Sequence, residues 1–219
     1  MSDAAGSFVA KHGRQRLIIA LLCAALPLAM LFSAGLGATR IPAVDVARIL
    51  LGKLIGGERM LRGISAGELS IVFDLRLPRI VCAAFTGSAL AAAGVIFQAI
   101  LQNPLADPYT LGVSTGAAFG ATLAIFLNIT ASLALSAPLF ALAFAGITLV
   151  AVLAISNRGA GLIKTNLIMA GIILSAILQA GISFIKISSG ENVGAIVFWL
   201  MGSLSGRSWN DALLLSPVV

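Results

Sequence analysis

Residues 108–157 form a run of 50 positions without a single Asp, Glu, Lys or Arg side chain. Over the whole chain of 219 residues, 59% are hydrophobic and 10% are charged, whereas about 25% of the residues in an average soluble domain are charged. Too few polar side chains remain to cover a water-soluble surface. The sequence therefore predicts a polytopic membrane protein and excludes the soluble globular, disordered and disulfide-stapled classes.

Long apolar stretches predict helices that cross the bilayer, because lipid offers no partner to an unpaired backbone group. Five stretches are interpreted as spans: Leu17–Ala38, Ile80–Leu101, Leu111–Leu127, Ala131–Ile155 and Leu167–Ile185. The first could be a signal peptide, but its apolar length favours a retained helix. A sixth begins near Ala212, and the sequence stops at Val219. We therefore expect a piece of a longer protein; the alternative is a helix packed at the membrane interface.

Residues 40–79 are the one substantial polar segment. Within it, Val44–Leu54 is predicted to be an amphipathic helix at the interface, and Gly56–Gly67 a loop. The segment holds seven of the 14 basic residues, which conflicts with the positive-inside tendency if the N-terminus is cytoplasmic. Charge alone therefore does not orient the chain. Pro78 is expected in the first turn of the second span, where its missing N–H is tolerated.

Small residues recur every three or four positions on two of the predicted spans. Such stripes let helix backbones approach closely, and they are Gly112, Gly116 and Gly120 on one helix and Gly87, Ala91 and Gly94 on another. Packing within one bundle is the favoured interpretation of the first stripe, and a dimer interface is the alternative. Gln98, which continues the second stripe, is predicted either to bond a neighbouring helix or to line a pathway.

The fifth predicted span carries a more polar stripe at the same spacing, which keeps its members on one slowly turning face. The stripe consists of Gly171, Ser175, Gln179 and Ser183. A face of this kind suits a hydrated path for a large polar cargo, or a tight helix contact. It is the best candidate in the sequence for a translocation surface.

The connector Asn103–Pro108 contains two X-Pro steps, at Pro104 and Pro108, which stop helices. It is predicted to be a rigid hairpin, and the isolated charge of Asp107 also suggests a functional contact. Catalytic patterns are otherwise weak. Gly112–Gly116 has the G-x-S-x-G spacing, but the single histidine, His12, lies in the polar leader. The sequence has no G-x-x-x-x-G-K-[ST] loop and no metal-ligand spacing, so we expect no ATPase site, cofactor or metal.

Several motifs in fixed order resemble one known family. They are Arg76-Leu-Pro-Arg79, Gly87–Gly94 with Gln98, Asn103–Pro108, Leu111–Ala117, Ala170–Ile172 and Trp199–Leu204 with Trp209. Together they are similar to the FecCD-type permeases, which import iron-siderophores, haem and vitamin B12. The resemblance implies an all-α, polytopic transmembrane bundle of the type II ATP-binding-cassette (ABC) importer kind. Ten helices are expected in full, of which about five and a half are present here.

The resemblance also implies partners and an orientation. Such a subunit pairs with a second permease subunit (a homodimer or heterodimer), a cytoplasmic ABC ATPase pair and an extracytoplasmic substrate-binding protein. It lies in the inner or plasma membrane of a bacterium or archaeon. We accordingly divide the chain into a cytoplasmic leader (1–16) and a transmembrane permease domain (17–219), incomplete at its C-terminus. Within that domain, 40–79 is extracytoplasmic or interfacial.

Residue roles carried over from the family are expectations too. Arg76 and Arg79 would dock the acidic residues of a binding protein; the alternative is that they anchor the helix at the interface. The inner loops or gate would involve Asn103, Pro104, Asp107, Lys164 and Thr165, and Lys164 departs from the small hydroxyl residues of relatives. The competing class is a self-contained secondary transporter or channel. It is disfavoured because the long spans lack the charged groups that couple ions.

Overall fold

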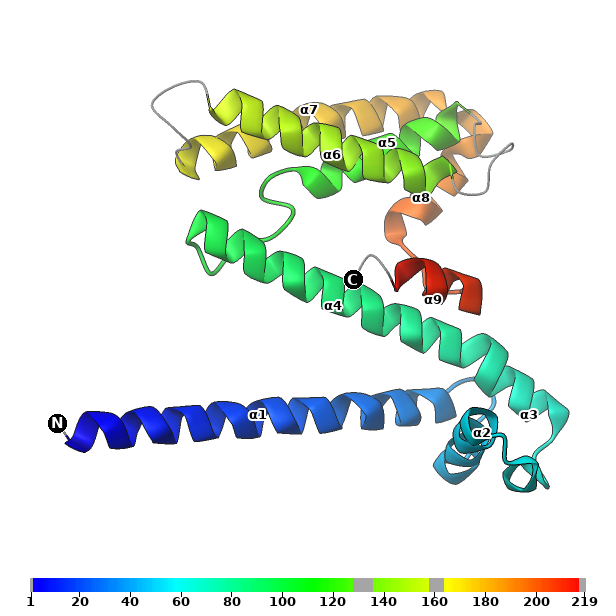
Figure 1. The fold of residues 1–219 in the computed structure, drawn as a ribbon. Helices are drawn as coiled ribbons and strands as arrows, with labels where there is room; N and C mark the ends of the chain where they lie inside the picture. Colours follow the sequence, from blue (N-terminus) through cyan, green and yellow to red (C-terminus); the bar gives the residue numbers. More distant parts are fainter. Residues whose placement is uncertain (1, 128–135, 158–163, 217–219) are drawn as a thin grey trace. The chain divides into compact units, whose positions relative to one another are not determined.

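The computed structural model describes residues 2–127, 136–157 and 164–216, and every regular element within them is helical. The longer helices are α1 (Ser2–Gly35), α2 (Ala43–Ile55), α4 (Leu77–Leu101), α5 (Val113–Phe126), α6 (Ser136–Ser156) and α7 (Lys164–Ser188). The shorter ones are η1 (Glu58–Leu61), α3 (Ala66–Ser70), η2 (Ile71–Arg76), η4 (Gly190–Asn192), α8 (Val193–Met201) and α9 (Trp209–Leu215). The all-α fold class expected from the sequence is thus confirmed (Figure 1).

Contacts divide the chain into two compact units. Unit 1 contains Met1–Gly87 and Leu204–Val219, and unit 2 contains Ser88–Ser203. Helix α4 runs from the first unit into the second. Each unit is described below by itself.

Four helical segments of the described chain are long and apolar enough to cross a membrane. They are Gly13–Gly35, Ala66–Leu101, Ser136–Ser156 and Lys164–Ser188. The predicted span at Leu111–Leu127 forms a helix, α5, of only 14 residues. At 1.5 Å per residue it covers about 21 Å, less than the ~30 Å hydrocarbon core. Its start is set by Gly112, whose φ of 73° ends the preceding turn.

The second span begins earlier than predicted. The loop expected at Gly56–Gly67 contains η1, and helix starts again at Ala66, not at Ile80. Ser65 and Glu68 form a capping box at this start: the Ser65 hydroxyl accepts from the Glu68 N–H (3.2 Å), and the Glu68 carboxylate accepts from the Ser65 N–H (3.0 Å). This pair satisfies two N–H groups that a helix start leaves unpaired.

Pro78 lies inside this continuous helix, so its expected place in the first turn of the span was wrong. A proline in a helix removes one hydrogen bond and its ring collides with the carbonyl one turn earlier. Here the turn before it, Ile71–Arg76, is π-helical, and Leu77 N–H bonds to Val72 O five residues back. The wider turn changes which carbonyls face the ring, so the helix passes through Pro78.

Unit 1 is organised around the end of α1. The amphipathic helix predicted at Val44–Leu54 is confirmed as α2, and its buried residues Val46 and Ile49 join a cluster with Ala34, Ile41 and Val72. Figure 1 shows α2 beside the C-terminal end of α1. Helix α2 ends where Gly56 adopts a left-handed conformation (φ 73°), as is common for a glycine after a helix.

Unit 2 is a packed group in which α5 contacts α6, α7 and α8. Helices α5 and α6 approach closely at two glycines. A Cβ on Gly120 would lie 2.4 Å from the Phe140 carbonyl oxygen, and one on Gly116 would lie 2.1 Å from the Thr148 hydroxyl. A second cluster lies under the Asn103–Gly112 connector and includes Leu101, Ala106, Leu111, Val152, Leu167 and Ala170.

Candidate functional site

Arg76 is tied to the end of α1. Its guanidinium donates to the carbonyl oxygens of Ala34 (2.8 Å) and Thr39 (2.5 Å), and the side chain is partly buried. Ala34 lies in the last turn of α1, whose carbonyls have no partner within the helix. A cation at this position also complements the negative end of the helix dipole. Gly37 completes the site, because a Cβ there would lie 2.6 Å from an Arg76 terminal nitrogen.

Arg79 has a different environment, although it is only three residues further along. Its Nε donates to the Leu204 carbonyl oxygen at 3.2 Å, and the side chain is exposed. One bond at Nε leaves the flat outer edge of the guanidinium in a position to meet a carboxylate in a two-bond geometry. The same unit therefore contains one arginine that is fixed to the main chain and one that faces outward.

Helix α9 packs beside these arginines' helix through an aromatic contact. Trp209 Nε1 donates to the Phe73 carbonyl oxygen (3.0 Å), and the two rings lie 5.3 Å apart between centroids. The start of α9 is capped by Asp211, whose carboxylate accepts from the Ser208 N–H and hydroxyl, both at 2.8 Å. These bonds, the main-chain one first, hold the pKa of Asp211 below its usual value, with a smaller contribution from Arg207 at 3.6 Å.

The connector after α4 is closed by its own side chains. The Asp107 carboxylate accepts from the Thr110 N–H (2.9 Å) and hydroxyl (2.8 Å), and the Asn103 side-chain oxygen accepts from the Leu105 N–H (2.9 Å). Asn and Asp bond the backbone in this way in turns. Pro104 is exposed between them. Both polar side chains thus stabilise the hairpin geometry that the two prolines predict.

A hydrogen bond between two side chains joins the start of α7 to the residue that follows α4. Lys164, the first residue of α7, donates from Nζ to the side-chain oxygen of Gln102, just after α4. Gln102 has a φ of 46° and is the one described non-glycine residue with a positive φ, a conformation that other residues rarely adopt. Thr165, next to Lys164, is exposed. Of the residues expected in the inner loops, Lys164 is therefore the one that joins two helices.

The polar stripe of α7 divides along its length. Gly171 is buried: a Cβ there would lie 2.6 Å from the Thr110 carbonyl oxygen. Ser175 is half-buried, and its hydroxyl would lie 2.5 Å from a Cβ on Gly112. Gln179 and Ser183 are exposed. The first half of the stripe therefore packs against the start of α5, and the second half presents polar groups outward.

The stripe on α4 has open surroundings. A Cβ added to Gly87 or Gly94 would meet no described atom within 4 Å, and Gln98 is exposed. Among the residues that the structure describes, no three His, Cys, Asp or Glu side chains gather as metal ligands do. The side chains that these stripes expose are amides and hydroxyl groups, at Gln98 on α4 and at Gln179 and Ser183 on α7.

Two residues that matter to these contacts were missed in the sequence. The sequence indicates only an ordinary turn at Gly37. Its lack of a side chain matters because the guanidinium of Arg76, 39 positions away, occupies that space. Gln102 precedes the Asn103-Pro104 turn, which could have suggested an unusual backbone conformation there. Its bond to Lys164 spans 62 residues, and no local pattern predicts such a contact.

These helices define a multi-pass membrane protein, and its fold is that of an ABC transporter permease. The chain belongs to the FecCD transport family, which matches residues 20–219. A solved chain from an inward-facing transporter, described as of the metal-chelate type, superposes with a TM-score of 0.72 at 30% identity. That match covers 90% of this chain and 57% of the other.

Curated relatives agree with this assignment. The ABC transporter permease protein YvrB of Bacillus subtilis is 39% identical over 184 residues, which are 83% of this chain and 52% of the relative. The Fe(3+)-citrate import system permease protein YfmE of the same organism is 35% identical over 211 residues, 94% of this chain and 58% of the relative. A cobalamin import permease, BtuC of Halobacterium salinarum, is 38% identical over 68% of this chain and 40% of its own length. The chain spans about half the length of the curated relatives it matches.

Proposed function

We propose that this chain forms part of the membrane-spanning subunit of an ABC importer whose cargo is an iron chelate. The observation that carries the proposal is the match to the Fe(3+)-citrate permease YfmE, which extends over 94% of the chain. Relatives named for iron chelatin and achromobactin transport support an iron-chelate cargo. Others are named for cobalamin and molybdate, so the family also carries other cargoes.

In this proposal, energy and cargo capture come from other polypeptides. These 219 residues contain no phosphate-binding loop of the G-x-x-x-x-G-K-[ST] kind, so a cytoplasmic pair of ABC ATPase subunits would hydrolyse ATP. A second permease subunit would complete the pathway at the interface between the two. A substrate-binding protein would deliver the chelate to the extracytoplasmic face of the cell membrane, and residues 1–16 would lie in the cytoplasm.

Arg79 is the better placed of the two arginines to receive the binding protein. Its guanidinium is exposed and makes one bond to the main chain, whereas Arg76 makes two and is partly buried. Charge pairs at the rim of an interface chiefly guide association, and their effect weakens with salt. Arg79 would therefore pair with a carboxylate of the binding protein, and Arg76 would hold the end of α1 in place beside it.

Two further groups of residues fit the pathway and its inner end. Gln98 on α4 and Gln179 and Ser183 on α7 present neutral polar groups, which suit a large hydrated cargo because they bind it weakly. The Lys164–Gln102 bond joins the start of α7 to the end of α4, and it would have to break if these helix ends separate during transport.

The docking role is tested by binding of the cognate substrate-binding protein to the full-length permease complex at low salt. Arg79→Glu should weaken binding more than Arg79→Gln, and both effects should shrink at high salt. Arg48→Glu is the matched control, since Arg48 is also exposed but already pairs with Asp45 at 3.4 Å. Equal binding by wild type and Arg79→Glu at low salt would remove Arg79 from the docking surface.

A further inference from the structure

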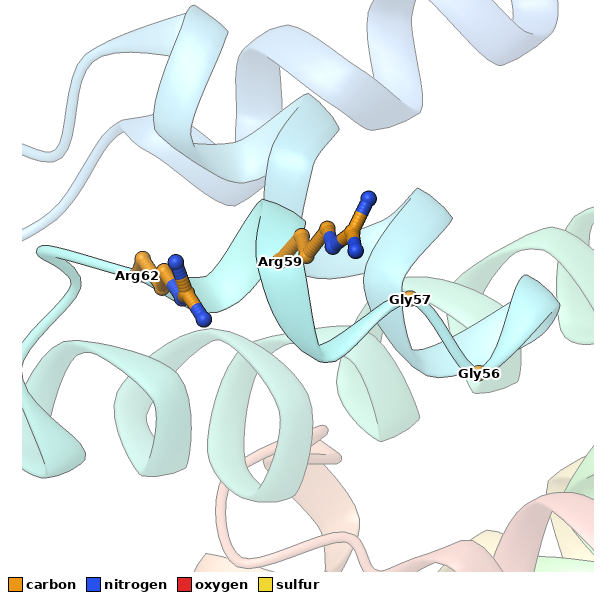
Figure 2. Close-up of a pocket in the computed structure, with 4 residues that line it drawn as sticks. All are labelled: Gly56, Gly57, Arg59 and Arg62. Atoms are coloured by element: carbon orange, nitrogen blue, oxygen red, sulfur yellow. The ribbon is translucent and has the colours of Figure 1, made fainter.

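A depression in unit 1 is lined by two arginines and two glycines that no role above uses. It lies where α2 ends, has a volume of about 680 Å³, and is formed by Gly56, Gly57, Arg59 and Arg62 (Figure 2). A volume of this size is enough for a small ligand or a lipid headgroup. Gly56 and Gly57 contribute only backbone to the wall of the depression, and Arg59 and Arg62 contribute its cationic groups.

Both arginines are available to a ligand. They are exposed, and neither forms a hydrogen bond or an ion pair with any side chain whose placement the structure describes. Arg48 and Lys53, the nearest basic residues on α2, are by contrast engaged: Arg48 pairs with Asp45, and Lys53 lies 5.3 Å from the centre of the Phe73 ring. A planar guanidinium with free donors binds phosphate oxygens with two parallel bonds.

Aliphatic side chains are exposed directly beside this depression. Leu54 and Ile55, the last residues of α2, are 80% and 72% exposed, and Leu51 and Met60 are exposed as well. The opposite face of α2 is already packed against the unit 1 core through Val46 and Ile49, so these side chains are not needed there. Helices with such an apolar face and basic neighbours lie in the boundary between headgroups and acyl chains.

The position of α2 along the chain sets its depth in the membrane. Helix α2 packs on Leu31 and Ala34, which lie in the last turns of the membrane-spanning segment Gly13–Gly35. The end of a span lies at the level of the lipid headgroups. In a membrane-embedded chain this packing would bring α2, and the residues that follow it, to the level of the lipid phosphates.

We propose that the segment Ala43–Arg62 binds the phosphate of an anionic phospholipid through Arg59 and Arg62, with Leu54 and Ile55 inserted among the acyl chains. The exposed aliphatic residues favour a lipid over an acidic protein, since an acidic surface would pair the arginines but leave Leu54 and Ile55 in water. The inference rests on the membrane location of α1 and is independent of the cargo and of the role of Arg79.

The test measures which lipids surround residue 55. The full-length permease with Cys23→Ala and Ile55→Cys is labelled at residue 55 with a fluorophore; Cys82 is buried and Cys23 exposed. The labelled protein is placed in nanodiscs of phosphatidylcholine containing phosphatidylglycerol, and one of the two lipids is brominated at a time to quench the fluorophore. The ratio of the two quenching efficiencies gives the local preference for the anionic lipid.

Brominated phosphatidylglycerol should quench more strongly than brominated phosphatidylcholine. Arg59→Gln with Arg62→Gln should reduce the relative affinity by roughly 25-fold, because each basic side chain contributes about 1 kcal/mol at an anionic membrane and 1.4 kcal/mol is tenfold. Arg48→Gln with Lys53→Gln, which removes two charges on α2 outside the depression, should change the preference little. Raising the salt concentration should weaken the preference in the reference protein.

Three results would overturn the proposal. Equal quenching by the two lipids would show no preference for the anionic headgroup. Absence of quenching by either lipid would place residue 55 outside the bilayer. If Arg59→Gln with Arg62→Gln kept the lipid preference but lost affinity for the substrate-binding protein in phosphatidylcholine discs, the two arginines would belong to a protein docking surface.

Discussion

Replacing Arg76 should destabilise the protein, whereas replacing Arg79 should not. Arg76→Ala removes two hydrogen bonds from a charged donor, at 2.8 and 2.5 Å, from a partly buried position. Bonds to charged groups contribute about 1.5–3 kcal/mol each, and partial exposure lets water replace some of this. A loss of about 2–4 kcal/mol is therefore expected. Arg79→Ala removes one exposed bond at 3.2 Å and should lose less than about 1 kcal/mol.

The assay is thermal unfolding of this 219-residue chain in detergent, followed by tryptophan fluorescence. For chains of 150–250 residues, 1 kcal/mol corresponds to about 2–4 °C, so Arg76→Ala should lower Tm by roughly 5–15 °C and Arg79→Ala by less than about 4 °C. Arg76→Lys keeps the charge but not the planar fork, and its Tm should fall between them.

Gly37 provides an independent check on the same contact. A Cβ at Gly37 would lie 2.6 Å from the Arg76 guanidinium, so Gly37→Ala should displace it and lower Tm as well. In the Arg76→Ala background, Gly37→Ala should have little further effect, because the group it displaces is gone. Equal Tm values for Arg76→Ala and Arg79→Ala would refute the assigned role of Arg76. Full additivity of the Tm losses of Gly37→Ala and Arg76→Ala would refute it as well.

Three more outcomes are expected from the geometry. Gly120→Ala should lower the free energy of unfolding by about 1–3 kcal/mol, since its new Cβ meets a main-chain oxygen at 2.4 Å that no rotamer change can move. Gly146→Ala, with open space around the new Cβ, should be neutral or slightly stabilising. The pKa of Asp211 is lowered in the folded state. Its ionised carboxylate therefore stabilises the fold above the usual aspartate pKa, and this stabilisation is lost as pH falls through the folded pKa. Asp211→Asn should make Tm depend less on pH in this acid range. Lys164→Met removes the bond to Gln102 and should raise ATP hydrolysis by the assembled complex in the absence of cargo, and an unchanged basal rate would exclude a closing role for this bond.

The features that hydropathy controls could be predicted from the sequence. The long spans follow from apolar runs, because lipid forces such runs into helices. The amphipathic pattern predicts a helix over Val44–Leu54, and α2 spans Ala43–Ile55. The family, too, was recognisable from ordered motifs around Arg76 and Asn103.

The errors occurred where local signals conflicted. Glu68 and Asp74 precede the predicted start of the second span at Ile80, yet they belong to the helical segment that continues into it. The capping box of Ser65 and Glu68 was visible in the sequence and was overlooked. The π-helical turn before Pro78 could not be inferred, since proline near a helix start is equally compatible with an ordinary first turn.

The other features of the site could not be predicted because they depend on contacts between residues far apart in the sequence. Arg76 and Arg79 have the same side chain and lie three residues apart. Only the fold of unit 1 places the Ala34 carbonyl beside Arg76 and the Leu204 carbonyl beside Arg79. The same holds for Lys164 and Gln102, where a lysine expected only as a departure from the family pattern joins two helix ends.

The central claim is that this chain supplies a membrane pathway whose energy and cargo come from partner proteins. Its most direct test is uptake of a radiolabelled ferric chelate into proteoliposomes that contain the full-length permease, with the ATPase and the substrate-binding protein added or left out. The account predicts ATP-dependent accumulation only when both partners are present. Accumulation driven by a proton or sodium gradient without the ATPase would contradict it and would indicate a secondary transporter.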